Sequence, residues 1–248
     1  MRFLTALWLA LAVSSGASAQ PEVLVSAAAS LANVMAQLAR AYEGRTGTRV
    51  TVNIGASNML ARQIRAGAAV DVFASADEAQ MDAVRSEIVA DTRIDLLSNQ
   101  LAIAVPADRP GVLRSARDLA GPAFKRIALG DPTAVPAGVY AKAYLAKLGI
   151  WPAVEGRVVP AASVRLALAA VENGAADAAI VYRTDVATAR RTRLAFVIPV
   201  SEGPRIVYPA AIIRTGRNRD GAIRFLKWLQ GEEASGIFKT AGFVPISQ

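Results

Sequence analysis

Small hydroxyl residues stand at several junctions between strand-like and helix-like segments. Ser30 follows three alanines, Ser57 lies in the GASN segment 55–58, and Ser75 lies in the ASAD segment 74–77. A serine before a helical pattern is a favoured N-cap, which alone would explain each of them. The small residues beside Ser30 and Ser57 also let the backbone approach a ligand, and helix N-termini present free N–H groups with a positive dipole end. Several such termini in one cleft would bind an anion without a charged side chain.

The second half of the chain offers matching groups. The PAG segment 136–138 opens a helical pattern with proline, whose missing N–H costs little there. Ser163 is a candidate N-cap before Val164, and Tyr182 ends an apolar strand pattern. The Tyr182 hydroxyl would face a cleft, or the side chain would be a half-buried core tyrosine.

Composition excludes several kinds of chemistry. The 248 residues include no Cys and no His, which rules out zinc fingers, thiol nucleophiles, disulfides and Ser-His-Asp triads. Phosphate-loop and GxGxxG motifs are absent as well. General acid–base catalysis would fall to carboxylates such as Asp71, Asp77 or Asp131, which also suit caps and turns.

The positive charge does not by itself indicate nucleic acid. The formal net charge is +8, but only five of the 28 basic residues are Lys, which points to an Arg-rich composition rather than a binding patch. Arg190, Arg191 and Arg193 are interpreted as a solvated turn. We expect no nucleic-acid partner.

The N-terminus has the pattern of a secretory signal peptide over residues 1–19. A short positive start, an apolar run of 11 residues (3–13) and the Ala17-Ser18-Ala19 segment precede a predicted cut before Gln20. The alternative, a membrane anchor, would need about 20 apolar residues. Export of a chain without cysteine favours the bacterial periplasm.

Strand and helix patterns alternate along the mature chain, which predicts an α/β fold with mostly parallel sheets. The expected strands cover residues 22–28, 49–54, 70–74, 100–105, 126–128, 178–182, 194–199 and 205–214. The expected helices cover residues 31–43, 59–66, 77–88, 139–147, 164–172, 220–230 and 232–241.

Two extended stretches, 97–106 and 205–214, flank the central block. If both are crossover strands, residues 20–98 and 211–248 form lobe I, and residues 99–210, with the two hinge strands, form lobe II. A hinge between two α/β lobes creates a ligand cleft.

The segments AAASLANVM, GASNMLARQIRAGAAVDVFASAD, GDPTAVPAGVYAKAYLAKLG, SVRLALAAVENGAADAAIVYRTD and VYPAAII together resemble the periplasmic molybdate-binding proteins of ABC transporters. The resemblance covers the mature chain in order. It implies a two-lobed, type II-like periplasmic binding protein that closes on molybdate or tungstate and delivers it to a membrane permease. It also implies a monomer without a resident cofactor and without catalysis.

In that family a tetrahedral oxyanion is held by serines, backbone amides and one tyrosine hydroxyl. Carried over, these groups are the hydroxyls of Ser30, Ser57 and Tyr182 and the amides of Ala137 and Val164. They would contact the metal only through the oxygens of the anion, as outer-sphere ligands. The chain departs from the family at Ala56 and Asn58, so the part played by the Leu31 and Asn58 amides stays open. The alternatives are another oxyanion, such as sulfate, or a periplasmic enzyme on the same fold.

Overall fold

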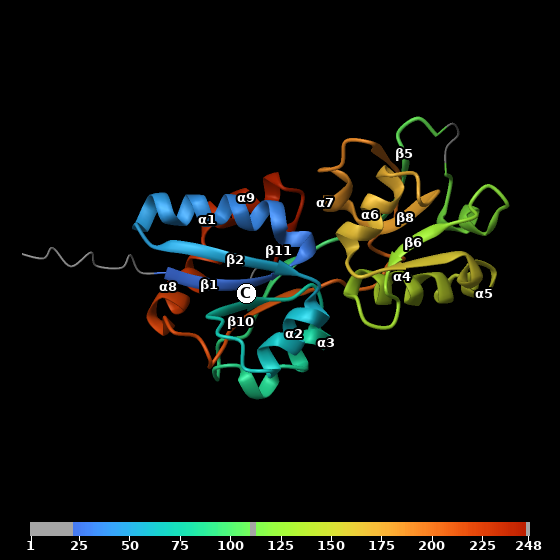
Figure 1. The fold of residues 1–248 in the computed structure, drawn as a ribbon. Coiled ribbons are helices and arrows are strands. Elements are labelled where there is room, and N and C mark those ends of the chain that lie inside the picture. The colour runs from blue at the N-terminus through green and yellow to red at the C-terminus, as the bar shows by residue number, and fades with distance from the viewer. Residues whose placement is uncertain (1–21, 110–112, 247–248) are drawn as a thin grey trace, which may run out of the picture.

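The computed structural model describes residues 22–109 and 113–246, which form two lobes joined by two chain crossings (Figure 1). The predicted signal peptide lies outside the described residues. Within the described ranges, no helix is both long and apolar enough to cross a membrane.

The first lobe is built on a six-stranded sheet with the order β11-β4-β10-β3-β1-β2. Its strands are β1 (Glu22–Ala28), β2 (Arg49–Gly55), β3 (Val72–Ala74), β4 (Ile94–Ser98), β10 (Tyr208–Ile212) and β11 (Val244–Pro245). One core contains the apolar faces of α1 (Ala32–Thr46), α8 (Arg219–Leu229) and α9 (Glu232–Thr240). A smaller core lies under α2 (Ser57–Arg65) and α3 (Glu78–Asp82), on the opposite side of the sheet (Figure 1).

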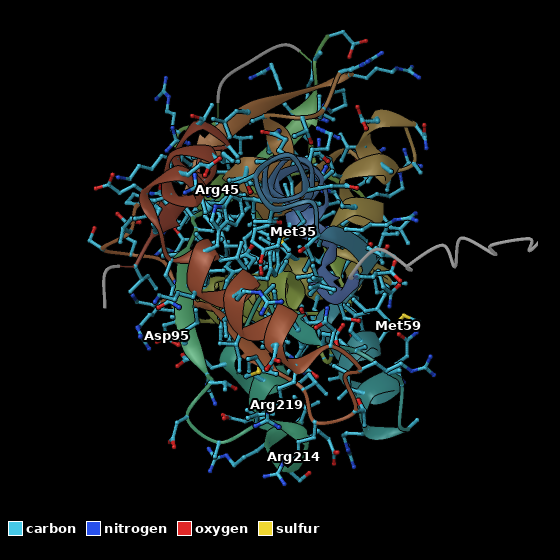
Figure 2. The ribbon with its side chains drawn as sticks, turned by 90° about the vertical axis from the view of Figure 1, so that its left-hand side faces the viewer. Met35, Arg45, Met59, Asp95, Arg214 and Arg219 are labelled. Carbon is cyan, nitrogen blue, oxygen red and sulfur yellow. The ribbon has the colours of Figure 1, made fainter. Side chains whose placement is uncertain are left out.

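The two methionines labelled in Figure 2 illustrate this burial. Met35 of α1 is 1% exposed and lies inside the lobe, whereas Met59 of α2 is 45% exposed and lies at its edge. The helix expected over residues 31–43 is confirmed as α1, and its apolar residues Val34, Met35, Leu38 and Tyr42 are buried. Gly47 ends this helix with φ 69°, a conformation that favours glycine.

The second lobe has a five-stranded sheet with the order β7-β6-β8-β5-β9. Its strands are β5 (Leu101–Pro106), β6 (Ile127–Gly130), β7 (Val158–Ala161), β8 (Ala178–Tyr182) and β9 (Thr192–Val197). Its α-helices are α4 (Pro136–Lys147), α5 (Trp151–Val154), α6 (Val164–Glu172) and α7 (Arg183–Val186). Short 3₁₀ turns cover Ala29–Leu31 and Arg85–Glu87 in the first lobe and Ala116–Ala120 and Glu155–Arg157 in the second.

Both sheets are mixed, so the prediction of mostly parallel sheets is wrong. β1 runs parallel to β2 and β3, and β6 runs parallel to β7 and β8. β10 is antiparallel to β3 and β4, and β5 is antiparallel to β8 and β9. β5 and β10 are the strands that follow a crossing, so each starts beside the other lobe and runs away from it. Their direction therefore opposes that of the strands that run toward the other lobe.

The chain crosses at Asn99-Gln100, between β4 and β5, and again over residues 198–207, between β9 and β10. The expected stretch 97–106 is therefore interrupted, and 205–214 contains a strand only from Tyr208 to Ile212. The expected boundary between residues 210 and 211 falls inside β10, which pairs entirely within the first sheet. Lobe I thus begins its second segment near Tyr208.

Candidate functional site

The carboxyl ends of six strands, three from each lobe, point toward one cavity. β1, β2 and β3 supply this edge in the first lobe, and β6, β7 and β8 supply it in the second. The empty space at this position, with open solvent at its mouth included, is about 210 Å³. It is lined by Ala28, Ala29, Ser30, Ala56, Ser57, Ala76, Val135, Pro136, Ala137, Val164 and Tyr182. Ligands of α/β proteins typically bind outside the carboxyl ends of strands.

All five predicted ligand residues line this cavity: Ser30, Ser57, Ala137, Val164 and Tyr182. Leu31 and Asn58, left open from the sequence, are not among the lining residues. Ala76 and Val135 line the cavity without having been singled out. Ala76 lies two residues after the end of β3 at Ala74, and Val135 directly precedes the predicted start of the PAG helix, so these positions were the available signal.

Ser57 is not an N-cap, contrary to the sequence-based expectation. α2 begins at Ser57 itself, and its N-cap is Ala56. The Ser57 Oγ instead accepts a hydrogen bond from the Ala76 backbone N–H at 2.9 Å, and the residue is 1% exposed. A serine hydroxyl carries one proton, and this contact leaves that proton free to be donated into the cavity.

Ser30 is not an N-cap either. It lies inside the 3₁₀ turn Ala29–Leu31, and the N-cap of α1 is Leu31, with no side-chain cap bond. The Ser30 Oγ lies 3.1 Å from the hydroxyl of Tyr208, and both residues are buried. The hydroxyl is therefore held by a side chain rather than by the start of its own helix.

The remaining two serines differ from each other. The N-cap of α3 is Asp77, which accepts from the Gln80 N–H at 3.0 Å. Ser75 bonds only to Asp77 itself: its Oγ accepts from the Asp77 N–H and donates to Asp77 Oδ1, both at 3.3 Å. The expectation that Ser75 caps this helix is wrong. Ser163 does cap α6, because its Oγ accepts from the Leu166 N–H at 3.2 Å.

The amides of Ala137 and Val164 lie in the first turns of α4 and α6. The first four N–H groups of a helix have no partner within it, and they carry the positive end of the dipole. The start of α4 rests directly on the end of β6. A Cβ on Gly138 would lie 1.8 Å from the Gly130 carbonyl oxygen, so only glycine permits this approach.

Tyr182 is more deeply buried than a half-buried core tyrosine, being 1% exposed. Tyr182 lines the cavity, and its hydroxyl has no hydrogen-bond partner among the described residues, although the Tyr208 hydroxyl is nearby. Burial raises the pKa of Tyr182 well above its ordinary value, so the hydroxyl keeps its proton. A buried hydroxyl without a partner is destabilising unless a ligand accepts from it.

A buried carboxylate lies behind the second-lobe groups. Asp185 is fully buried; its Oδ2 accepts from the Tyr182 N–H at 3.3 Å, and its Oδ1 lies 2.7 Å from Nε of Arg165. Burial raises the pKa of Asp185 to about 6, although the charge of Arg165 acts in the opposite direction. The Arg165–Asp185 ion pair therefore links the residue after Val164 to the backbone of Tyr182.

The cavity lining therefore offers hydroxyl and amide donors but no charged side chain. Such a surface suits a small, fully deprotonated anion, because every oxygen of the anion accepts hydrogen bonds. It offers no carboxylate for a general base or for a hard cation.

Comparison with known proteins agrees with this geometry. Residues 23–244 match the family described as bacterial extracellular solute-binding proteins. The molybdate-binding protein ModA of Escherichia coli is 36% identical over 95% of this chain and 94% of its own length. ModA of Haemophilus influenzae is 33% identical over 91% of each chain.

Solved structures show the same arrangement. The periplasmic molybdate-binding protein of Azotobacter vinelandii superposes with a TM-score of 0.82 at 28% identity, over 91% of this chain and all of that one. The sulfate-binding protein SubI of Mycobacterium tuberculosis also reaches 0.82, but at 18% identity, over 92% of this chain and 88% of its own; that likeness concerns the fold alone. The chain belongs to the bacterial extracellular solute-binding proteins and, within them, to the family of the molybdate-binding proteins.

Proposed function

We propose that this protein captures molybdate in the periplasm and delivers it to the membrane permease of an ABC transporter. One observation carries the proposal: five hydrogen-bond donors from two lobes meet in one cavity whose lining has no charged side chain. They are the hydroxyls of Ser30, Ser57 and Tyr182 and the amides of Ala137 and Val164. The names of the relatives supply the ligand class.

The donor set matches the chemistry of molybdate. MoO₄²⁻ is a dianion at neutral pH and presents only acceptors, so each protein donor can be used. A hydrogen bond to a charged group contributes about 1.5–3 kcal/mol, which offsets the desolvation of the dianion. The metal would be contacted only through its oxygens, and no resident cofactor is expected.

Selectivity follows from the same donors. Hydrogen phosphate carries a proton that needs an acceptor, and the lining offers no carboxylate for it. Sulfate is fully deprotonated but smaller, so donors spaced for molybdate would bond it loosely. Tungstate has nearly the size of molybdate and is expected to bind alike.

The proposed mechanism is capture by lobe closure. Ser30 and Ser57 belong to the first lobe, and Ala137, Val164 and Tyr182 belong to the second. An anion bonded to both lobes stabilises the closed arrangement, because only there are all donors used. The closed protein then docks on the permease.

The remaining expectations concern the setting of the protein. The predicted signal peptide over residues 1–19 would direct the chain to the periplasm, where we expect a monomer with no nucleic-acid partner. We expect no catalysis, because the lining holds neither a nucleophile–base pair nor a carboxylate. Among the described residues, no cluster of acidic side chains could hold a metal cation.

Isothermal titration of residues 20–248 with molybdate, tungstate, sulfate and phosphate tests the proposal. We expect one molybdate or tungstate per chain and binding at least tenfold weaker for sulfate and phosphate, a difference of about 1.4 kcal/mol. Sulfate binding as tight as molybdate binding would overturn the ligand assignment in favour of the sulfate alternative.

A further inference from the structure

We propose that Asn99 and Tyr208 form a hydrogen-bond relay that runs from the crossover segment to Ser30 and makes Ser30 a donor to the bound anion. Both are positioning residues, since neither lines the cavity. The inference rests on the proposed function, because it assumes that Ser30 contacts the anion.

The relay begins at the first crossing, where the orientation of the Asn99 amide is fixed. Its Oδ1 accepts from the Gln100 N–H at 2.8 Å. Its Nδ2 lies 2.9 Å from the Thr184 Oγ1 and 3.4 Å from the Tyr208 hydroxyl oxygen. An amide nitrogen can only donate, so the Tyr208 oxygen accepts from Asn99.

Tyr208 sets the direction of the next hydrogen bond, the one to Ser30. It is the first residue of β10, directly after the second crossing, and it is 1% exposed. Burial raises the pKa of Tyr208, so the hydroxyl keeps its proton. With its oxygen accepting from Asn99, we assign that proton to the Ser30 Oγ, 3.1 Å away; the Tyr182 hydroxyl is the competing neighbour of Tyr208.

The direction of the Ser30 hydroxyl proton is thereby defined. When its oxygen accepts from Tyr208, its own proton points elsewhere, and the residue lines the cavity. In the reverse direction Ser30 would donate to Tyr208 and present only lone pairs to the anion, which is repulsive. The relay selects the first arrangement before the anion arrives, so little reorganisation accompanies binding.

Tyr182 also faces Tyr208, with ring centroids 5.6 Å apart. A tyrosine-to-phenylalanine change at 208 could therefore act through Tyr182 instead of Ser30. A double-mutant cycle separates the two routes, because residues that act through one another are non-additive.

The experiment measures the molybdate Kd of wild type, Tyr208→Phe, Ser30→Ala and the double variant by titration. Tyr208→Phe keeps the ring and is expected to weaken binding about tenfold in the wild-type background. In the Ser30→Ala background the same change is expected to alter Kd less than twofold. Asn99→Ala, which removes the donor to the Tyr208 oxygen without adding a charge, should show the same pattern.

Thr184→Val is the matched control, because it removes the other partner of Asn99 and leaves the contact with Tyr208. Its Kd should stay within about twofold of wild type, and a loss equal to that of Tyr208→Phe would overturn the relay. Equal losses from Tyr208→Phe in both Ser30 backgrounds would also overturn it. A second cycle with Tyr182→Phe completes the test: if Tyr208→Phe were non-additive with Tyr182→Phe but additive with Ser30→Ala, the relay would be overturned. Those results leave the proposed function standing, whereas wild-type protein that does not bind molybdate would remove both.

Discussion

The Ser57 Oγ accepts the backbone N–H of Ala76 at 2.9 Å, and both residues line the cavity between the lobes. The contact joins the start of α2 to the turn after β3, which is 19 residues later in the chain. It satisfies a buried amide with the acceptor side of a hydroxyl and leaves the donor side for an anion. One side chain thus supports the backbone and is available to a ligand.

Replacing Ser57 by alanine removes both uses of the hydroxyl. The Ala76 amide would be left buried without its partner, so we expect the free energy of unfolding to fall by about 1–3 kcal/mol. We also expect molybdate to bind at least tenfold more weakly. Thermal melts without ligand and titration calorimetry measure the two effects.

Ser75→Ala is the control for that variant, because Ser75 is buried but does not line the cavity. It should lower stability while leaving the molybdate Kd within about twofold. If Ser75→Ala weakened binding as much as Ser57→Ala, the effect would reflect general loosening of the lobe.

Tyr182→Phe should separate affinity from stability. Its hydroxyl has no partner among the described residues, so removing it should leave the melting temperature of the free protein unchanged or raised. Loss of one charge-assisted bond of about 1.5–3 kcal/mol should weaken molybdate binding by roughly ten- to a hundredfold. Tyr144→Phe, whose hydroxyl bonds Glu202 outside the cavity, should bind like wild type. An unchanged Kd for Tyr182→Phe would remove this residue from the site.

Gly138→Ala tests the close approach that places the Ala137 amide. The added Cβ would lie 1.8 Å from the Gly130 carbonyl oxygen, so α4 must move away from β6. We expect a loss of several kcal/mol in stability, as for other steric insertions, together with weaker molybdate binding. Gly236→Ala in α9 has open space around it and should gain up to about 1 kcal/mol. Chemical denaturation measures both, and equal stability of the two variants would contradict the predicted clash.

Asp185 should give the protein a distinctive pH profile. Burial raises the pKa of Asp185 from 3.8 to about 6 in the folded chain. Between these values the folded chain holds a proton that the unfolded chain has released, so this group lowers the free energy of unfolding as the pH rises. The decline is on the order of 3 kcal/mol and is complete above the folded pKa.

Asp185→Asn carries no titrating group at this position. Relative to wild type, its free energy of unfolding should therefore rise between pH 4 and 6 and then stay level. Loss of the ion pair with Arg165 adds a penalty that does not depend on pH in this range, and the Arg165 bond to Thr188 remains. Urea denaturation at half-unit pH steps measures the difference. Parallel profiles for the two proteins would show that Asp185 does not titrate in this range.

The sequence located the candidate ligand residues better than it predicted their local roles. Strand-to-helix junctions beside small residues identified Ser30 and Ser57, and the family resemblance added the amides of Ala137 and Val164. The N-cap expectation was wrong at Ser30, Ser57 and Ser75 because a shift of one or two residues in a helix start decides which group caps it. The actual partners of Ser30 and Ser57 are Tyr208 and Ala76, which lie 178 and 19 residues away in the chain.

The sequence pattern also did not show in which direction neighbouring strands run. Buried strands such as β5 and β8 read as continuous apolar runs whether they pair in parallel or antiparallel fashion. The helix expected over residues 77–88 is divided into α3 and the turn Arg85–Glu87. The contacts that give Asn99 its proposed role have no local signal, because Thr184 and Tyr208 lie 85 and 109 residues away.

A crystal structure of the protein grown with molybdate, with anomalous data collected at the molybdenum edge, tests the central claim most directly. We predict one anomalous peak per chain, in the cavity between the lobes. The anion oxygens should lie within about 3.2 Å of the Ser30, Ser57 and Tyr182 hydroxyls and the Ala137 and Val164 amides. A single peak outside this cavity, or one held by arginine side chains, would contradict the proposal that neutral donors of both lobes bind the anion.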